Sequence, residues 1–211
     1  MTNTHQNVFL KAIMAGVYIG VAGLIYLSLD SKIIGSLMFS FGLLVVVTRG
    51  YYLYTGKVGY LFPYQKGYIV ILLKTLLGNM IGIASIAFLF RLTGITSVIT
   101  EASTLYDLKL AHLWYETLIL SIFCGMMMFI AVDSFVKVKH DFAKIMILVF
   151  AVMIFILAKF EHSIANMLYL FLSDSYSLKS FFYLILMIIG NGIGGVALNL
   201  VETKLGTENR M

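Results

Sequence analysis

The chain has 211 residues, of which 61% are hydrophobic and only 12% are charged, and its mean hydropathy is +0.97. Soluble domains carry about 25% charged residues, so this composition excludes a soluble protein and predicts a polytopic membrane protein. The net charge is +5, but the sequence has no run of five or more basic residues. We therefore do not expect nucleic acid as a partner. A single cysteine, Cys124, cannot form an internal disulfide framework or a multi-thiolate metal site.

Six hydrophobic runs follow one another along the chain, which predicts an all-α protein with six membrane spans in the lipid bilayer. The expected spans are residues 12–29, 33–63, 67–92, 110–132, 145–172 and 178–201. The longest loop, residues 93–109, is expected between the third and fourth spans. The most basic loop, residues 133–144, is expected after the fourth span.

Two of the six runs are interrupted. The second stays apolar to Val47, and residues 48–57 are then polar and aromatic with two glycines. The fifth, residues 145–172, is too long for one straight crossing, because about 20 helical residues span the hydrocarbon. Backbone that leaves a helix at membrane depth is tolerated only where it faces protein or water. We therefore expect broken helices in spans two and five, and we expect them to line a cavity or pore.

The break in the fifth span carries three ionisable side chains, Lys159, Glu161 and His162, within four residues. A charged group at the centre of a bilayer costs about 2.5–3.5 kcal/mol, so such residues indicate a functional site. The alternative is a buried structural histidine whose hydrogen bonds are satisfied by its neighbours. Lys159 also has a second interpretation, because a cation there can neutralise the carbonyl groups at the end of a half-helix.

A short glycine pattern occurs twice in the chain. Residues 78–82, Gly-Asn-Met-Ile-Gly, recur as residues 190–194, Gly-Asn-Gly-Ile-Gly, 112 residues later. An interrupted span precedes each copy, so we expect two three-span repeats, about residues 9–92 and 110–203, within one channel domain of residues 1–211. Repeats with an odd number of spans have opposite topology, and the solute site then lies between their discontinuous helices. The glycines alone have a simpler interpretation as close contacts between helices.

Basic residues in the loops predict the orientation. The termini and the loops after spans two and four carry seven lysines and arginines, and the opposite loops carry four. The first set is Lys11, Lys66, Lys137, Lys139, Lys144, Lys204 and Arg210, and the second is Lys32, Arg91, Lys109 and Lys179. Because basic residues are enriched in cytoplasmic loops, we expect both termini in the cytoplasm and the protein in the inner, or plasma, membrane.

Three motifs resemble those of the formate/nitrite transporter family. Residues 160–167, Phe-Glu-His-Ser-Ile-Ala-Asn-Met, resemble its fifth-span signature. Residues 53–56, Leu-Tyr-Thr-Gly, resemble its second-span loop motif, and residues 190–195, Gly-Asn-Gly-Ile-Gly-Gly, its sixth-span motif. The resemblance extends over residues 9–201. It implies an aquaporin-like protomer in a homopentamer, with one pore per protomer for formate, nitrite, hydrosulfide, lactate or a similar small monovalent anion.

The resemblance also implies which residues form the pathway. Thr55 is matched to the pore-lining threonine and His162 to the central histidine. The remaining pathway positions are Lys109 and Glu116 in the outer vestibule and Asn166 in the fifth-span motif. The apolar constrictions fall on Phe39 and Leu43, and on Leu53 and Phe155.

The chemistry of these side chains suits a channel for weak acids. Phe39 and Leu43 are four residues apart and share one helix face, and Phe155 is expected two helical turns from His162, toward the cytoplasm. A bare anion should not cross apolar constrictions, because desolvating an isolated charge is prohibitive, whereas a neutral acid can cross. We therefore expect an anion to be attracted by lysine charge, protonated and passed as the acid, with proton coupling through His162. Whether His162 gives up its proton or only stabilises the anion stays open.

Lys109 is expected to act at the entrance from outside. It closes the loop of residues 93–109 and opens the fourth span on the face with fewer basic residues, so its charge should be locally unopposed. Positive potential at a pore mouth concentrates anions there. Glu116, seven residues on, should lie two turns deeper on the same helix face and hold the hydrogen bonds of the vestibule.

One position departs from the pattern of the family. Members that carry formate usually have an asparagine in the fourth span facing the histidine, and matching through Glu116 puts Gly125 in that place. The missing side chain would remove a hydrogen-bond partner and widen the chamber. This weakens a preference for formate and leaves hydrosulfide, nitrite or a larger carboxylate open.

Three classes of function compete. The leading hypothesis is a channel for small monovalent anions or their acids. The alternative is a neutral-solute channel of the aquaporin type, although the Asn-Pro-Ala pairs of that family are absent because Pro63 is the only proline. An enzyme would need a nucleophile or metal constellation, which one cysteine and scattered histidines do not provide. We therefore expect no enzymatic activity, no cofactor and no metal.

Overall fold

The structure, a computed structural model, describes residues 7–208, and Arg210 lies outside this range. Within the range every regular element is helical. The helices are α1 (Val8–Ser28), α2 (Lys32–Thr48), α3 (Tyr54–Lys57), the 3-10 helix η1 (Val58–Leu61), α4 (Tyr68–Arg91), α5 (Thr96–Leu110), α6 (Trp114–Lys137), α7 (Asp141–Leu157), α8 (Ser163–Leu172) and α9 (Leu178–Glu208). By length and composition, α1, α4, α6 and most of α9 are able to cross a membrane, and α2 and α8 are shorter apolar helices.

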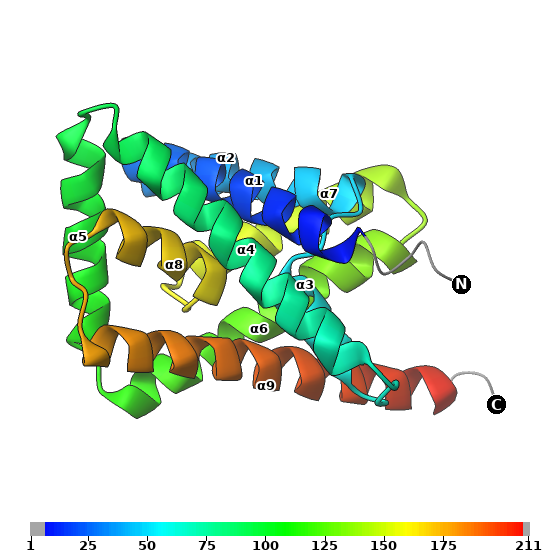
Figure 1. The fold of residues 1–211 in the computed structure, drawn as a ribbon. Coiled ribbons are helices and arrows are strands. Elements are labelled where there is room, and N and C mark those ends of the chain that lie inside the picture. The colour runs from blue at the N-terminus through cyan, green and yellow to red at the C-terminus, as the bar shows by residue number, and fades with distance from the viewer. Residues whose placement is uncertain (1–6, 209–211) are drawn as a thin grey trace.

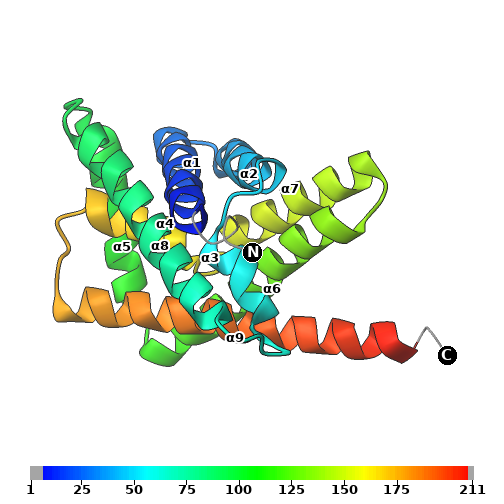
Figure 2. The ribbon, with the colours of Figure 1, turned by 45° about the vertical axis from the view of Figure 1, so that its right-hand side comes forward.

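The helices form a bundle with one helix across its end. In Figure 1, α1 begins and α9 ends at the right-hand side of the molecule. At the left-hand side α5 runs across the direction of the other helices, and Figure 2 also shows it at the end of the bundle farthest from the last turns of α9. The first and last described helices therefore have their free ends on one side, and α5 covers the other side.

The prediction that residues 93–109 form a loop is wrong, because most of them belong to helix α5. Val98, Ala102 and Tyr106 recur every four residues and are buried, which gives this helix one apolar face. The polar residues between them hide this periodicity in a search for membrane spans. The helix of the expected fourth span, α6, consequently begins at Trp114 and not at residue 110, and a short connection separates it from α5.

The repeated glycine motif packs two pairs of helices closely. A Cβ added to Gly82 or Gly78 of α4 would collide with the backbone of α1, and one added to Gly194 or Gly190 of α9 would collide with the backbone of α6. Close approach of this kind needs residues without a side chain. The interpretation of these four glycines as helix contacts is therefore confirmed.

Two connections leave the helical conformation near the middle of the bundle. The first, residues 49–53, follows α2 and leads into α3, and the second, residues 158–162, follows α7 and leads into α8. Each has a residue with positive φ at the second position after the helix, Gly50 at 62° and Lys159 at 58°. Only glycine adopts this conformation without strain, so the backbone of Gly50 is unstrained and that of Lys159 is strained.

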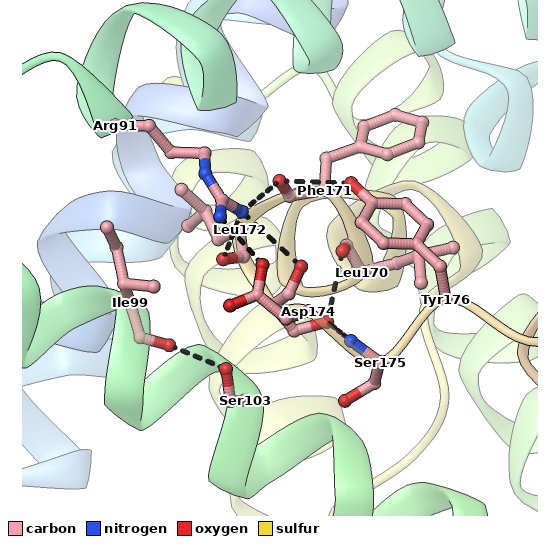
Figure 3. Close-up of polar contacts among 10 residues, drawn as sticks. Arg91, Ile99, Ser103, Leu170, Phe171, Leu172, Asp174, Ser175 and Tyr176 are labelled. Atoms are coloured by element: carbon pink, nitrogen blue, oxygen red, sulfur yellow. Dashed lines mark hydrogen bonds and ion pairs between the residues drawn. The ribbon is translucent and has the colours of Figure 1, made fainter.

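Helix α8 is fixed at its C-terminal end by Arg91 from the end of α4. As Figure 3 shows, the guanidinium lies over the last turn of α8, where it donates to the carbonyl groups of Phe171, Leu172 and Ser173 at 2.9–3.4 Å. The same side chain pairs with Asp174 at 2.7 Å. A cation at a helix C-terminus satisfies carbonyls that lack intrahelical donors and opposes the negative end of the helix dipole.

Candidate functional site

Thr55 and His162 meet where the two non-helical connections approach each other. The hydroxyl oxygen of Thr55, at the start of α3, lies 2.9 Å from Nε2 of His162, and the two residues are 1% and 2% exposed. His162 is also the N-cap of α8, since its Nδ1 accepts a hydrogen bond of 3.0 Å from the backbone N–H of Ala165. An Nδ1 that accepts cannot carry the proton, so the neutral ring is protonated on Nε2 and donates to Thr55.

Two buried asparagines hold the connections in place. Oδ1 of Asn191 accepts from the backbone N–H of Ser163 at 2.9 Å, and its Nδ2 donates to the carbonyls of Glu161 and Ser121 at 2.8 Å each. The side chain therefore ties the start of α8 to α6 and α9.

Asn79 does the same for the first connection. Its Oδ1 accepts from the backbone N–H of Tyr54 at 2.8 Å, and its Nδ2 donates to the carbonyls of Tyr52 and Ala12 at 2.8 Å each. In the sequence, Asn79 and Asn191 stand out only as parts of the glycine motif. The signal that could have found them is the recurrence of a polar residue between glycines on two otherwise apolar helices.

Lys109, Glu161 and Asn166 form a second polar cluster beside His162. The Lys109 ammonium lies 2.7 Å from Oε2 of Glu161, and the two side chains are only 17% and 3% exposed. Nδ2 of Asn166 donates to the same carboxylate oxygen at 2.9 Å and to the carbonyl of His162 at 3.0 Å. The expectation that the charge of Lys109 is unopposed is therefore wrong, because Glu161 neutralises it.

Two buried polar atoms near this cluster have no hydrogen-bond partner among the described residues. They are Oγ of Ser163 and Oδ1 of Asn166. Both residues belong to the first turn of α8, next to His162. Buried polar groups are nearly always paired, so two unpaired ones in a single helical turn are typical of a place where a solute or water binds.

Glu116 does not lie on the helix that carries Lys109. Its Oε2 accepts from the backbone N–H of Leu113 at 2.8 Å, which caps the start of α6. His112 lies 3.8 Å from the same carboxylate, and both side chains are exposed. The expected common helix face is wrong because the chain ends α5 at Leu110 before α6 begins.

A cavity of about 420 Å³ opens from the α5 side toward His162. Its lining includes three lysines and a pair of phenylalanines: Lys32, Lys109, Lys159, Phe39 and Phe155. Asn166, Glu161 and His162 also line it, whereas Thr55 does not. The lining thus combines cationic groups with an apolar wall in front of the buried histidine.

The apolar residues expected at the constrictions are all buried, but they pair differently. Phe39 contacts Phe155 edge-on at 6.2 Å between ring centres, and Phe155 stacks on the His162 ring at 5.3 Å. The expected separation of two helical turns between Phe155 and His162 is therefore wrong, because α7 ends at Leu157 and the chain turns back. Leu53 instead lines a smaller void of about 70 Å³, and Leu43 lines neither.

Gly125 does not face the histidine. A Cβ at this position would collide with the backbone of Asn191, so Gly125 lies in the contact between α6 and α9. The expectation that Gly125 widens the chamber is wrong, because α6 and α9 touch at this point.

Residues 7–208 contain no group of three or more histidine, cysteine or acidic residues that could hold a metal ion.

Curated relatives of the chain are transporters and channels. It is 28% identical to the formate channel FocA of Haemophilus influenzae in an alignment of 181 positions that covers 75% of this chain and 63% of that channel. It is 24% identical to the nitrite transporter NirC of Salmonella typhimurium in an alignment of 218 positions that covers 92% of this chain and 81% of that protein. The matched part spans less than two thirds of the formate channel.

Solved structures share the fold. An ion channel of the FNT family has a TM-score of 0.84 at 23% identity, with 96% of this chain and 91% of that chain covered. A pentameric formate channel with formate bound has a TM-score of 0.76 at 22% identity, with 96% and 95% covered. A family model described as formate/nitrite transporter matches residues 1–202. The chain therefore belongs to the formate/nitrite transporter family.

Proposed function

We propose that the chain is a membrane channel for small monovalent anions, such as formate, nitrite or hydrosulfide, that pass together with a proton as the neutral acid. The observation that carries this proposal is the buried Thr55–His162 pair behind an apolar aromatic wall and a cavity lined by lysines. The family supports a channel or transporter, and its relatives include a formate channel and a nitrite transporter by name.

The proposed membrane topology has six crossings in two inverted repeats. The first repeat, about residues 9–92, consists of α1, the broken span α2–α3–η1, and α4. The second, about residues 110–203, consists of α6, the broken span α7–α8, and α9. Equivalent hydrogen bonds from Asn79 and Asn191 to the two breaks support this symmetry. The free ends of α1 and α9 face the cytoplasm of the inner membrane, α5 faces outside, and five aquaporin-like protomers assemble as in the pentameric structural relative.

The proposed path leads from the wide cavity past Phe39 and Phe155 to Thr55 and His162. It then continues past Leu43 and Leu53 toward the smaller void on the other side. The aromatic pair excludes a bare anion, because the desolvation of an isolated charge is too costly. A neutral acid crosses at lower cost and keeps one O–H or S–H donor. The unpaired Oδ1 of Asn166 lies beside this path and offers that donor an acceptor.

His162 acts on the anion through Thr55 in this proposal. With Nδ1 engaged by Ala165, Nε2–H donates, and the hydroxyl of Thr55 is free to donate in turn to an anion. Protonation of the ring at Nδ1 requires the bond from Ala165 to break, which costs about 1 kcal/mol. Proton coupling through His162 therefore includes a small local opening at the start of α8.

Flux into proteoliposomes tests this function against the neutral-solute alternative. Vesicles that contain the protein should take up formate, nitrite or hydrosulfide faster as the external pH falls, and they should be no more permeable to glycerol or water than empty vesicles. The control is His162→Phe, which fills the chamber with an apolar ring. Rapid glycerol or water flux without anion uptake would replace the proposal by a channel of the aquaporin type.

A further inference from the structure

The large cavity contains one lysine whose charge no acidic group opposes. Of the three lysines that line it, Lys32 pairs with Glu101 at 2.8 Å and Lys109 pairs with Glu161 at 2.7 Å. Lys159 is exposed to the cavity side and forms no ion pair or side-chain hydrogen bond within residues 7–208. The electrostatic attraction of an anion into this cavity therefore depends on Lys159 more than on the two paired lysines.

The backbone of Lys159 is in a conformation that favours glycine. Its φ is 58°, and it is the residue in positive φ in the turn that ends α7. In this turn Phe160 N–H donates to the carbonyl of Phe155 at 2.8 Å, and Lys159 N–H donates to that of Ile156 at 3.1 Å. This pair of bonds is the Schellman arrangement, whose left-handed residue is usually glycine.

The first half of the chain has the same turn with the usual residue. At the end of α2, Tyr51 N–H donates to the carbonyl of Val46 at 2.9 Å, and Gly50 N–H to that of Val47 at 3.2 Å, with φ of Gly50 at 62°. Gly50 lines the small void and Lys159 lines the large cavity. The fold thus accepts backbone strain at one of two matching turns and places a long cationic side chain there. Strain that is retained at a cavity is a reason to look for a function of the side chain.

We propose that Lys159 is the residue that captures the anion in the large cavity, before the anion reaches Phe39 and Phe155. This inference rests on the proposed function. It differs from a role of Lys159 as a cap for the carbonyls of α7, because a cap would affect folding and not the concentration of anions. A single unit charge acting over several ångströms of wet cavity changes capture roughly three- to tenfold at low salt, and screening near 0.15 M, where the Debye length is about 8 Å, reduces this effect in part.

The experiment measures formate and nitrite uptake into proteoliposomes at about 10 mM and 150 mM ionic strength. Lys159→Asn removes the charge and keeps a residue that tolerates positive φ. It should raise the apparent KM roughly three- to tenfold at low ionic strength and roughly two- to threefold at the higher one, with an unchanged maximal rate. Lys159→Arg should retain the wild-type KM. Lys179→Asn removes a lysine in the first turn of α9, which starts at the α5 end of the bundle, but outside the cavity lining, and should leave the KM unchanged.

A second variant keeps the test independent of folding. Lys159→Gly removes the strain together with the charge, so it should raise the melting temperature in detergent while it weakens capture as Lys159→Asn does. Equal KM and equal salt dependence in wild type and both neutral variants would overturn the inference. So would a loss of capture in Lys159→Arg as large as in Lys159→Asn. If wild-type vesicles pass glycerol or water but no anion, the proposed function fails, and this inference fails with it.

Discussion

Asn191 is predicted to be a main determinant of the position of α8. The change to test is Asn191→Leu, which keeps the size of a fully buried side chain but removes all three of its hydrogen bonds. The N–H of Ser163 and the carbonyl of Glu161 then lose their partner, whereas the carbonyl of Ser121 lies inside α6 and has an intrahelical donor. Two buried backbone groups without partners cost about 2–6 kcal/mol. This corresponds to a fall in melting temperature of roughly 10 °C for a chain of this size.

The assay for this prediction combines thermal unfolding in detergent with formate uptake. Asn79→Leu is the matched variant in the first half and should lose a similar amount of stability, since it breaks the same three kinds of bond. Ser85→Leu, at an exposed position of α4 with one bond inside its own helix, is the control and should unfold like wild type. If Asn191→Leu unfolds at the same temperature as the control and transports normally, the reasoning that this side chain fixes the break is refuted.

Three further substitutions test the site. His162→Asn keeps an N-cap for α8 and a donor but cannot exchange a proton, so uptake should persist with a flatter pH profile; an unchanged profile would remove the histidine from proton coupling. Lys109→Ala leaves Glu161 buried without its cation, so it should lower stability by about 3–5 kcal/mol, and adding Glu161→Gln should restore assembly on native mass spectrometry. If the double variant fails to assemble, the ion-pair explanation is contradicted. Gly125→Asn should prevent assembly because the side chain meets the backbone of Asn191; a stable variant with altered selectivity would instead put this position at the chamber.

The sequence was most informative where polar residues interrupt an apolar span. The polar breaks of residues 48–57 and 159–167 predicted that Thr55 and His162 would come together, and the structure brings them to 2.9 Å. Helix α5 was missed because its apolar residues are separated by polar ones and were compared with the pattern of a membrane span.

The pairing of Lys109 with Glu161 could not be predicted from spacing, because 52 positions separate them and their contact depends on how α5 lies across the bundle. The same limit applies to Gly125. The sequence of α6 shows a small residue at this position, but only the crossing of α6 with α9 determines that it faces α9.

The contact of Arg91 with the last carbonyls of α8 has a consequence for the field at the other end of that helix. A helix carries about half a positive charge at its N-terminus and half a negative charge at its C-terminus. Arg91 compensates the negative end, since it donates to three terminal carbonyls there. The ten residues of α8 therefore act less as a dipole than as a single partial positive charge directed at the first turn, where His162 and Asn166 lie. An anion that reaches this point is stabilised by the backbone itself, even while the histidine ring remains neutral.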